Sequence, residues 1–222
     1  MFDFIKKRNH NFSNRDMLFG DLPLSYWGAV NCKDVPWSLF KEVKKSVEKG
    51  RKNKAISILT EIINMPGLES RQYLQAYHFL NELQESDGTD IKILGVVVEV
   101  SMPQGNDTLA VYADHSARYY NFSGKSIIWE HPDESIDAMI DSILTKSVNT
   151  VAQIGPWKDV RPNPPGKEMA RINFLTSHGL HFGEASQQVL FNDPLAGAIM
   201  YDMVKLMNTL IDKSTHQSSS VS

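Results

Sequence analysis

Four polar residues lie near one predicted turn between two strands, where they could do acid–base or ligand-binding chemistry. Asp114 and His115 lie at the turn, Arg118 lies in the strand that follows, and Glu130 ends the next strand. If the first turn has two loop residues and the second has three, Arg118 faces Glu130 directly across the strands. Such a pair is either a structural ion pair at the end of the sheet or part of a functional cleft that Asp114 or His115 completes. The sequence leaves both interpretations open.

A second candidate site is the proline-rich segment 155–167, which is too long for a simple connection. Its prolines exclude a helix and disfavour a central strand. The segment carries Trp157 and Arg161, and these two residue types are enriched at the energetic centres of protein interfaces. Trp157 could instead attach the loop to the core, so the segment is either a binding loop or a packed one.

The familiar catalytic and cofactor motifs do not occur in this sequence. It has no glycine-rich phosphate loop and no Gly-x-Ser-x-Gly turn that would expose a nucleophilic serine. His178 and His181 straddle a predicted hairpin turn, but no His-Glu-x-x-His spacing or neighbouring thiol accompanies them. We therefore expect no metal site and no cofactor, and we assign no catalytic residue.

The same loop lengths predict further cross-strand neighbours. Tyr112 would face Tyr119, and Tyr119 would face Trp129, which gives one aromatic side of the sheet. This ladder could stack on a base, a sugar or a proline, or it could pack against a helix. Glu99, inside an apolar strand, is expected to face solvent, with a buried acid as the alternative.

The elements that must position these residues follow from the spacing of the apolar side chains. A helical period predicts helices, whereas alternation bounded by turn residues predicts strands. The predicted helices are 36–49, 53–64, 70–84, 133–154 and 193–212, and the predicted strands are 93–102, 108–114, 117–122, 126–130, 170–176 and 180–183. The fold class is therefore α+β: an N-terminal antiparallel helical array followed by an antiparallel meander sheet packed by two long helices. We expect a helical region at 1–88, a sheet domain at 89–213 and a disordered tail at 214–222.

The composition and charge of the chain argue against several classes of protein. The chain has 222 residues, with 23 Lys and Arg against 26 Asp and Glu, and a formal net charge of -3. This balance does not supply the basic surface that phosphate backbones select, so we expect no nucleic-acid partner. No apolar run is long enough to span a bilayer, and the first residues do not follow the pattern of a secretory signal. The single cysteine, Cys32, cannot form a disulfide within the chain, and we expect a cytoplasmic protein with no membrane partner.

Three stretches of the sequence resemble those of one protein family. They run from Leu109 to Lys125, from Ile154 to Pro165 and from Pro66 to Arg71. They look like the corresponding stretches of an uncharacterised family of bacterial proteins, and the resemblance covers most of the chain from about Lys54 onward. It implies a bacterial source and the order of domains given above, and it implies no activity, cofactor or catalytic residue.

Two hypotheses of different kinds follow. The first is a non-catalytic interaction or regulatory module that engages another protein through the proline-rich loop and the sheet edge. The alternative is a small hydrolase or ligand-binding domain with a polar cleft at the end of the meander. That cleft would use Asp114, His115, Arg118 and Glu130, with His178 and His181 nearby. Balanced charge and missing catalytic motifs favour the first hypothesis, and the oligomeric state stays open.

Overall fold

The computed structural model describes residues 12–27, 33–84, 90–130 and 132–219. The chain divides into two compact units, each of which is described by itself. Unit 1 holds residues 1–91 together with 177–179, and unit 2 holds residues 92–176 and 180–222. The domain boundary that the sequence predicts, between residues 88 and 89, lies outside the described residues.

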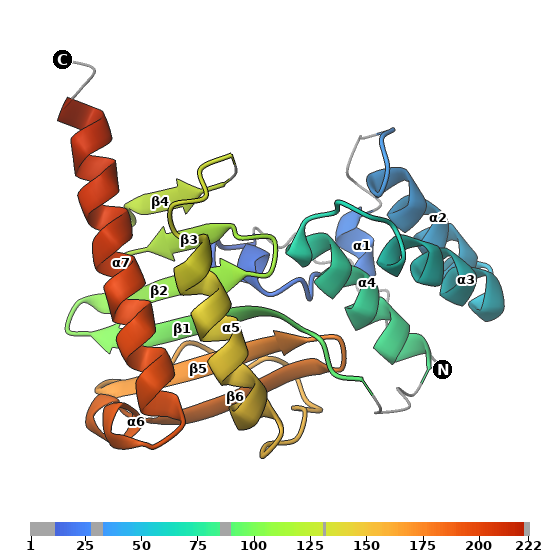
Figure 1. The fold of residues 1–222 in the computed structure, drawn as a ribbon. Helices are drawn as coiled ribbons and strands as arrows, with labels where there is room; N and C mark the ends of the chain where they lie inside the picture. The colour runs from blue at the N-terminus through green and yellow to red at the C-terminus, as the bar shows by residue number, and fades with distance from the viewer. Residues whose placement is uncertain (1–11, 28–32, 85–89, 131, 220–222) are drawn as a thin grey trace. The chain divides into compact units, whose positions relative to one another are not determined.

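Unit 1 is built from helices that follow one another along the chain (Figure 1). A 3-10 turn at Asp16–Leu18 and the short α1 (Leu24–Trp27) precede α2 (Trp37–Glu48), α3 (Lys52–Ile63) and α4 (Ser70–Leu83). The last three helices agree with the predicted ones to within one residue at each end, because each has a clear apolar stripe. The stripes meet in one core that includes Phe40, Val43, Ala55, Leu59, Ile62, Ala76 and Phe79.

Unit 2 contains one six-stranded antiparallel sheet with the strand order β4-β3-β2-β1-β5-β6 (Figure 1). The strands are β1 (Ile93–Met102), β2 (Gly105–Tyr112), β3 (Ala117–Tyr120), β4 (Ser126–Trp129), β5 (Met169–Thr176) and β6 (Gly179–Ser186). The first four strands form a meander, and the chain then returns so that β5 pairs with the other side of β1. The two edge strands are therefore β4 and β6.

Two long helices, α5 (Asp137–Val151) and α7 (Ala196–Ser219), cover one face of this sheet, and the short α6 (Gln187–Asn192) leads from β6 to α7 (Figure 1). Alternate strand residues on that face and the apolar stripes of both helices form a continuous core. Its fully buried members include Val96, Val111, Ile140, Ile143, Ile199 and Leu206. The predicted α+β class, with helices first and then a meander packed by two long helices, is confirmed.

Helix α7 continues through residues that the sequence predicts to be disordered. The hydroxyl of Ser214 donates to the carbonyl of Ile211 at 2.8 Å, and that of Thr215 donates to the carbonyl of Asp212 at 2.7 Å. Both bonds reach back to the preceding turn, and α7 extends to Ser219. The helix thus includes 214–219 of the predicted tail, and 220–222 lie outside the described residues.

The turn between β2 and β3 is longer than predicted, and this changes the register of the sheet. Leu109 pairs with Tyr119, so Tyr112 does not face Tyr119, and Ile127 rather than Trp129 lies opposite Tyr119 on the other side. The register between β2 and β3 differs from the predicted one by an odd number of residues. Side chains of β2 and β3 that were predicted to share a face therefore lie on opposite faces. The predicted aromatic ladder was wrong in its pairing, and Tyr119 and Trp129 lie in the helix-covered core instead of forming a stacking platform.

Part of the opposite face of the sheet is buried as well. Glu99, Arg118, Arg171 and Asn173 all lie there and are almost fully buried. The expectation that Glu99 faces solvent was wrong, because β1 is a central strand whose second face is covered too. This face therefore holds buried charge, which must be paired to be tolerated.

Within the described ranges, no helix combines the length and the apolar character that a bilayer crossing needs.

Candidate interaction site

The β2–β3 turn holds Asp114 and His115 in a compact loop. Oδ1 of Asp114 accepts hydrogen bonds from the backbone N–H and the hydroxyl of Ser116, at 3.0 and 2.7 Å. His115 has a left-handed backbone with φ 61°, and its N–H donates to the carbonyl of Tyr112. These local bonds stabilise a longer turn than two residues would give, and they account for the change in register.

His115 connects this turn to the first part of α5. Its Nδ1 lies 3.3 Å from Oδ2 of Asp137, and its Nε2 lies 2.9 Å from Oδ1 of Asp141. The hydrogen bond to Asp141, helped by the negative charges of Asp137, Asp141 and Asp114, raises the pKa of His115, while partial burial opposes the rise. A protonated imidazole can donate to both carboxylates, so the contacts favour a structural cation over a general base.

Arg118 is buried in β3 and pairs with Glu130. Its Nη1 donates to the carbonyl of Ala117 at 2.9 Å and to that of Trp129 at 3.0 Å, and its Nη2 binds Oε1 of Glu130. The residue directly across from Arg118 is Ile128, so the predicted facing pair was wrong in register, and the ion pair forms on the diagonal. Because the Glu130 side chain is largely exposed, Arg118 mainly secures the end of β4 to β3.

The four polar residues near the β2–β3 turn therefore make two separate sets of contacts. Asp114 and His115 organise the turn and hold it to α5, whereas Arg118 and Glu130 fasten the end of the β4 strand. The two carboxylates on α5 could not be foreseen, because they come from a helix more than twenty residues further along the chain.

The proline-rich loop 155–167 is held against the edge strand β6. The N–H of Trp157 donates to the carbonyl of Leu180 at 2.6 Å, and its indole Nε1 donates to the carbonyl of Val160 at 3.0 Å. The indole also packs against the ring of Phe182, with 5.1 Å between centroids. The loop is therefore fixed at one end by both backbone and side chain.

The same loop presents apolar surface to solvent. Trp157 is 42% exposed and Val160 is 91% exposed, while Arg161 is partly buried. The indole packs on Phe182 of the sheet and still leaves a large part of its surface open, so a binding role of Trp157 stays a prediction.

Beside the loop, Arg171 of β5 forms a buried ionic network. Its Nε donates to Oε2 of Glu184 at 2.6 Å, and its Nη2 binds the same oxygen. Its Nη1 donates to the carbonyl of Asn163 at 2.8 Å and lies 3.7 Å from Oε2 of Glu99. The guanidinium carbon lies 5.1 Å from the ring centroid of Phe182. Arg171 therefore connects the loop with β1, β5 and β6.

An asparagine completes this network. The side-chain N–H₂ of Asn173 donates to the carbonyl of Val97 at 3.0 Å and to Oε2 of Glu99 at 3.1 Å. The carboxylate of Glu99 is thus compensated by a cation and an amide, as a fully buried charge requires. Sequence reasoning missed this group, although the alternation of Arg171 and Asn173 with apolar neighbours was a signal that both share one face.

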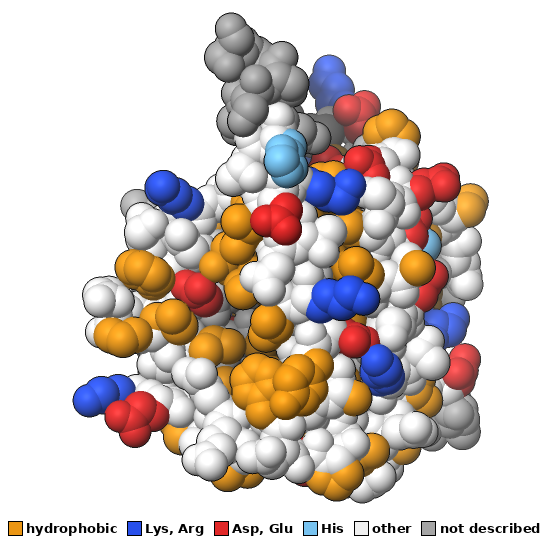
Figure 2. All heavy atoms as spheres, turned by 60° about the vertical axis from the view of Figure 1, so that its left-hand side comes forward, with side chains coloured by type: hydrophobic (Ala, Val, Ile, Leu, Met, Phe, Trp, Pro, Cys, Tyr) orange, Lys and Arg blue, Asp and Glu red, His pale blue; other side chains and the backbone are white. Residues whose placement is uncertain are grey.

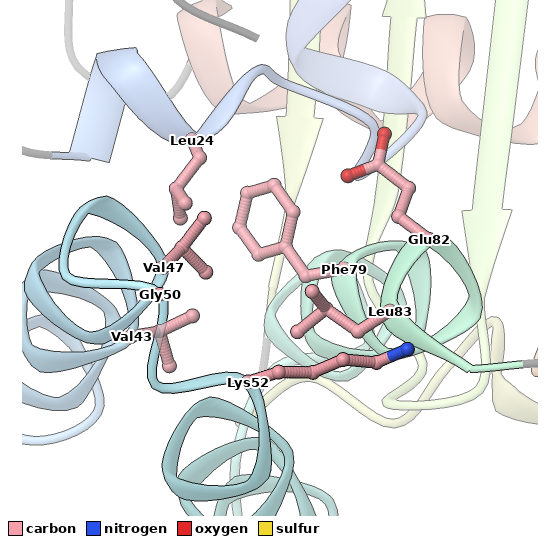
Figure 3. Close-up of a pocket in the computed structure, with 8 residues that line it drawn as sticks. All are labelled: Leu24, Val43, Val47, Gly50, Lys52, Phe79, Glu82 and Leu83. Atoms are coloured by element: carbon pink, nitrogen blue, oxygen red, sulfur yellow. The ribbon is translucent and has the colours of Figure 1, made fainter. Parts of the chain in front are cut away.

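Unit 1 has an apolar pocket of about 120 Å³ (Figure 3). Figure 3 shows apolar side chains of α2 opposite those of α4, with Lys52 and Glu82 nearby; the lining residues are Leu24, Val43, Val47, Gly50, Lys52, Phe79, Glu82 and Leu83. Burial raises the pKa of Glu82, and the neighbouring His78 opposes this rise. A space of this size suits one ring-sized apolar group.

Figure 2 shows exposed apolar side chains on one face of the molecule, with charged side chains between them. On the helices of unit 2, Tyr201, Val148 and Val204 are exposed. The Tyr201 ring packs against Phe191 with 5.2 Å between centroids, which covers part of both rings. Scattered exposed apolar residues of this kind are common on protein surfaces.

In the part of the chain that the structure describes, no group of three or more His, Cys, Asp or Glu side chains is placed to hold a metal ion. His181 is fully buried, and its Nδ1 lies 3.5 Å from the hydroxyl of Thr176. Cys32 lies outside the described residues.

Comparison with models of protein families, with curated proteins and with solved structures gives no match to this chain. This agrees with a resemblance to an uncharacterised family, which likewise carries no activity or site residue over to this sequence.

Proposed function

We propose that this protein is a non-catalytic protein-interaction module that binds another protein through loop 155–167. The proposal rests on one observation, which is that the loop is fixed at two points while a valine between them is exposed. Hydrogen bonds fix the loop at Trp157 and at Asn163, and Val160 between them is 91% exposed. An apolar side chain on a fixed loop loses little conformational entropy on binding, and full burial of a valine is worth about 1.5–3 kcal/mol.

The exposed part of the Trp157 indole extends this apolar surface. The residues between Trp157 and Val160 are the charged Lys158 and Asp159, both exposed. An apolar centre with charged neighbours is the usual composition of a protein-binding patch. The partner would therefore offer an apolar depression with polar groups around it.

The contacts of His115 and Arg118 favour this proposal over the hydrolase or ligand-binding alternative. Both ring nitrogens of His115 lie against carboxylates of α5, and the Arg118 guanidinium is engaged by two carbonyls and Glu130.

The proposal includes a regulatory role in the cytoplasm of a bacterium, supported by the family resemblance and the single cysteine.

The test is quantitative recovery of partners from a native lysate with wild-type protein and loop variants. Val160→Ser and the double variant Trp157→Ala with Arg161→Ala should each lose the same partner. Val148→Ser on α5 is the matched control, because Val148 is also an exposed valine, and it should recover that partner as the wild type does. Equal recovery of every partner by wild type and both loop variants would refute the proposal.

A further inference from the structure

β6 is an edge strand, and the backbone contacts show which of its groups face outwards. The carbonyl of Leu180 accepts a hydrogen bond from Trp157 in loop 155–167, so this carbonyl points away from β5. In a strand the N–H and C=O of one residue point to the same side, and every second residue repeats that direction. The backbone groups of Phe182 and Glu184 therefore point away from β5 as well.

Side-chain contacts agree with this assignment. Phe182 and Glu184 both contact Arg171, so their side chains share one face, as those of residues two apart must. In the described ranges, neither residue has a backbone hydrogen bond to a loop or turn, in contrast to Leu180. Glu184 as a whole is exposed although its side chain is only 28% exposed, so its main chain is open to solvent as well.

We propose that this edge pairs with the same edge of a second copy of the chain, antiparallel and about a two-fold axis at Gly183. In this register Phe182 of one copy lies opposite Glu184 of the other, and each such pair exchanges both of its N–H···O=C bonds. The two sheets then form one continuous sheet. The inference is separate from the proposed function, because it uses the edge of β6 and not the exposed residues of the loop.

The open part of β6 is symmetric about Gly183, which favours a second copy over a foreign strand. One outward-facing residue lies on each side of Gly183. Beyond them, Leu180 is occupied by the loop at one end, and α6 begins at Gln187 at the other. The axis places Leu180 of one copy opposite Ser186 of the other. Because Trp157 already occupies the Leu180 carbonyl, the pairing is limited to Phe182 and Glu184.

The side chains are also compatible with this pairing. Each Glu184 lies beside a Phe182 rather than beside the other Glu184, and each keeps its own Arg171. Residues at the axis form a non-hydrogen-bonded pair, in which the Cα atoms approach to about 4.5 Å. Both are Gly183, so no side chains collide there. A Cβ at Gly183 meets nothing within 4 Å in one chain, so a larger residue is compatible with the fold but crowds the axis.

The test is a charge exchange at the axis. Full-length wild type, Gly183→Lys and Gly183→Glu are compared by analytical ultracentrifugation up to about 1 mM chain. The wild type should form a dimer, and each variant alone should weaken it by about tenfold or more, because like charges then lie directly opposite each other. An equimolar mixture of the two variants should restore the dimer, since residue 183 faces only its own counterpart. Gly155→Lys, whose Cβ also enters open space, is the control and should dimerise as the wild type does.

Amide hydrogen exchange gives a second measurement on the wild type. The N–H groups of Phe182 and Glu184 should exchange more slowly as the concentration rises, whereas that of Gly183, which points to β5, should not change. A wild type that stays monomeric would overturn the inference, as would a dimer that Gly183→Lys leaves unchanged. A monomer that binds a foreign protein and loses it in Gly183→Lys would also overturn it, because the edge would then accept a foreign strand. Val160→Ser should leave the dimer intact, which separates this inference from the proposed function.

Discussion

Replacing Arg171 with methionine should destabilise unit 2 by about 4 kcal/mol, because the change leaves a buried carboxylate without its cation. Arg171 is 5% exposed and Glu99 is 0% exposed, with 3.7 Å between Nη1 and Oε2. Two unit charges at this separation interact by about 4 kcal/mol at an effective dielectric constant of about 20. Breaking buried pairs by removal of one partner costs about 3–5 kcal/mol, in agreement with this value. Methionine keeps much of the apolar stem of arginine, so the change removes charge more than volume.

Urea unfolding with hydrogen exchange read on peptides of β1 and β5 would measure this loss, because it reports on unit 2 directly. A loss of about 4 kcal/mol corresponds to a decrease in Tm of roughly 8–16 °C for a domain of this size class. Lys167→Met is the matched control, since the Lys167 side chain is 87% exposed. Its stability should change by less than about 0.5 kcal/mol.

A double variant separates the charge effect from simple loss of packing. Adding Glu99→Met to Arg171→Met also removes the buried carboxylate that has lost its cation, so the double variant should regain about 2 kcal/mol or more relative to the single one. The reasoning is refuted if Arg171→Met loses less than about 1 kcal/mol, which is the range of surface pairs. It is also refuted if the double variant is no more stable than the single variant.

Two further predictions concern unit 2. The pKa of His115 in the folded chain is raised above its ordinary value of 6.5, so the stability it contributes is complete below the unfolded value and is lost as the pH rises through the folded value. Urea midpoints should therefore be lower at about pH 8 than at about pH 6, and His115→Gln should reduce this difference; an unchanged difference would contradict the assignment. Gly95→Ala should cost about 1–3 kcal/mol, because its Cβ would lie 2.8 Å from the ring of Tyr112. Thermal unfolding of Gly95→Ala is compared with that of Gly155→Ala, whose added Cβ enters open space. Equal losses of stability in the two variants would argue against close packing at Gly95.

The helices of unit 1 and the succession of strands along the chain were predictable because their signals are local. The apolar stripe of α3, for example, repeats every three or four residues, and no distant contact changes it. The meander was predictable for the same reason, because its strands pair with their neighbours in the chain.

The register of the sheet and the pairing of the buried charges depend on side-chain and long-range contacts that no sequence pattern indicates. The bonds from Ser116 to Asp114 lengthen the turn without a glycine to mark it. The acidic partners of His115 come from α5, which lies further along the chain. The contact of Arg171 with Glu99 forms only because β5 returns to pair with β1. Residue type alone predicted Trp157 and Arg161 as candidates but not the exposed Val160 between them, because valine carries no signal of binding.

The place of β1 at the centre of the sheet also bears on how the chain folds during synthesis. β1 can pair with β2 as soon as both are made, but its other partner, β5, follows only after α5. The face that α7 covers stays open for longer still, since α7 comes after every strand. During synthesis, unit 2 is therefore for a time an incomplete sheet, with one side of β1 unpaired and an apolar face exposed. Partly folded chains of this kind are the ones that chaperones bind.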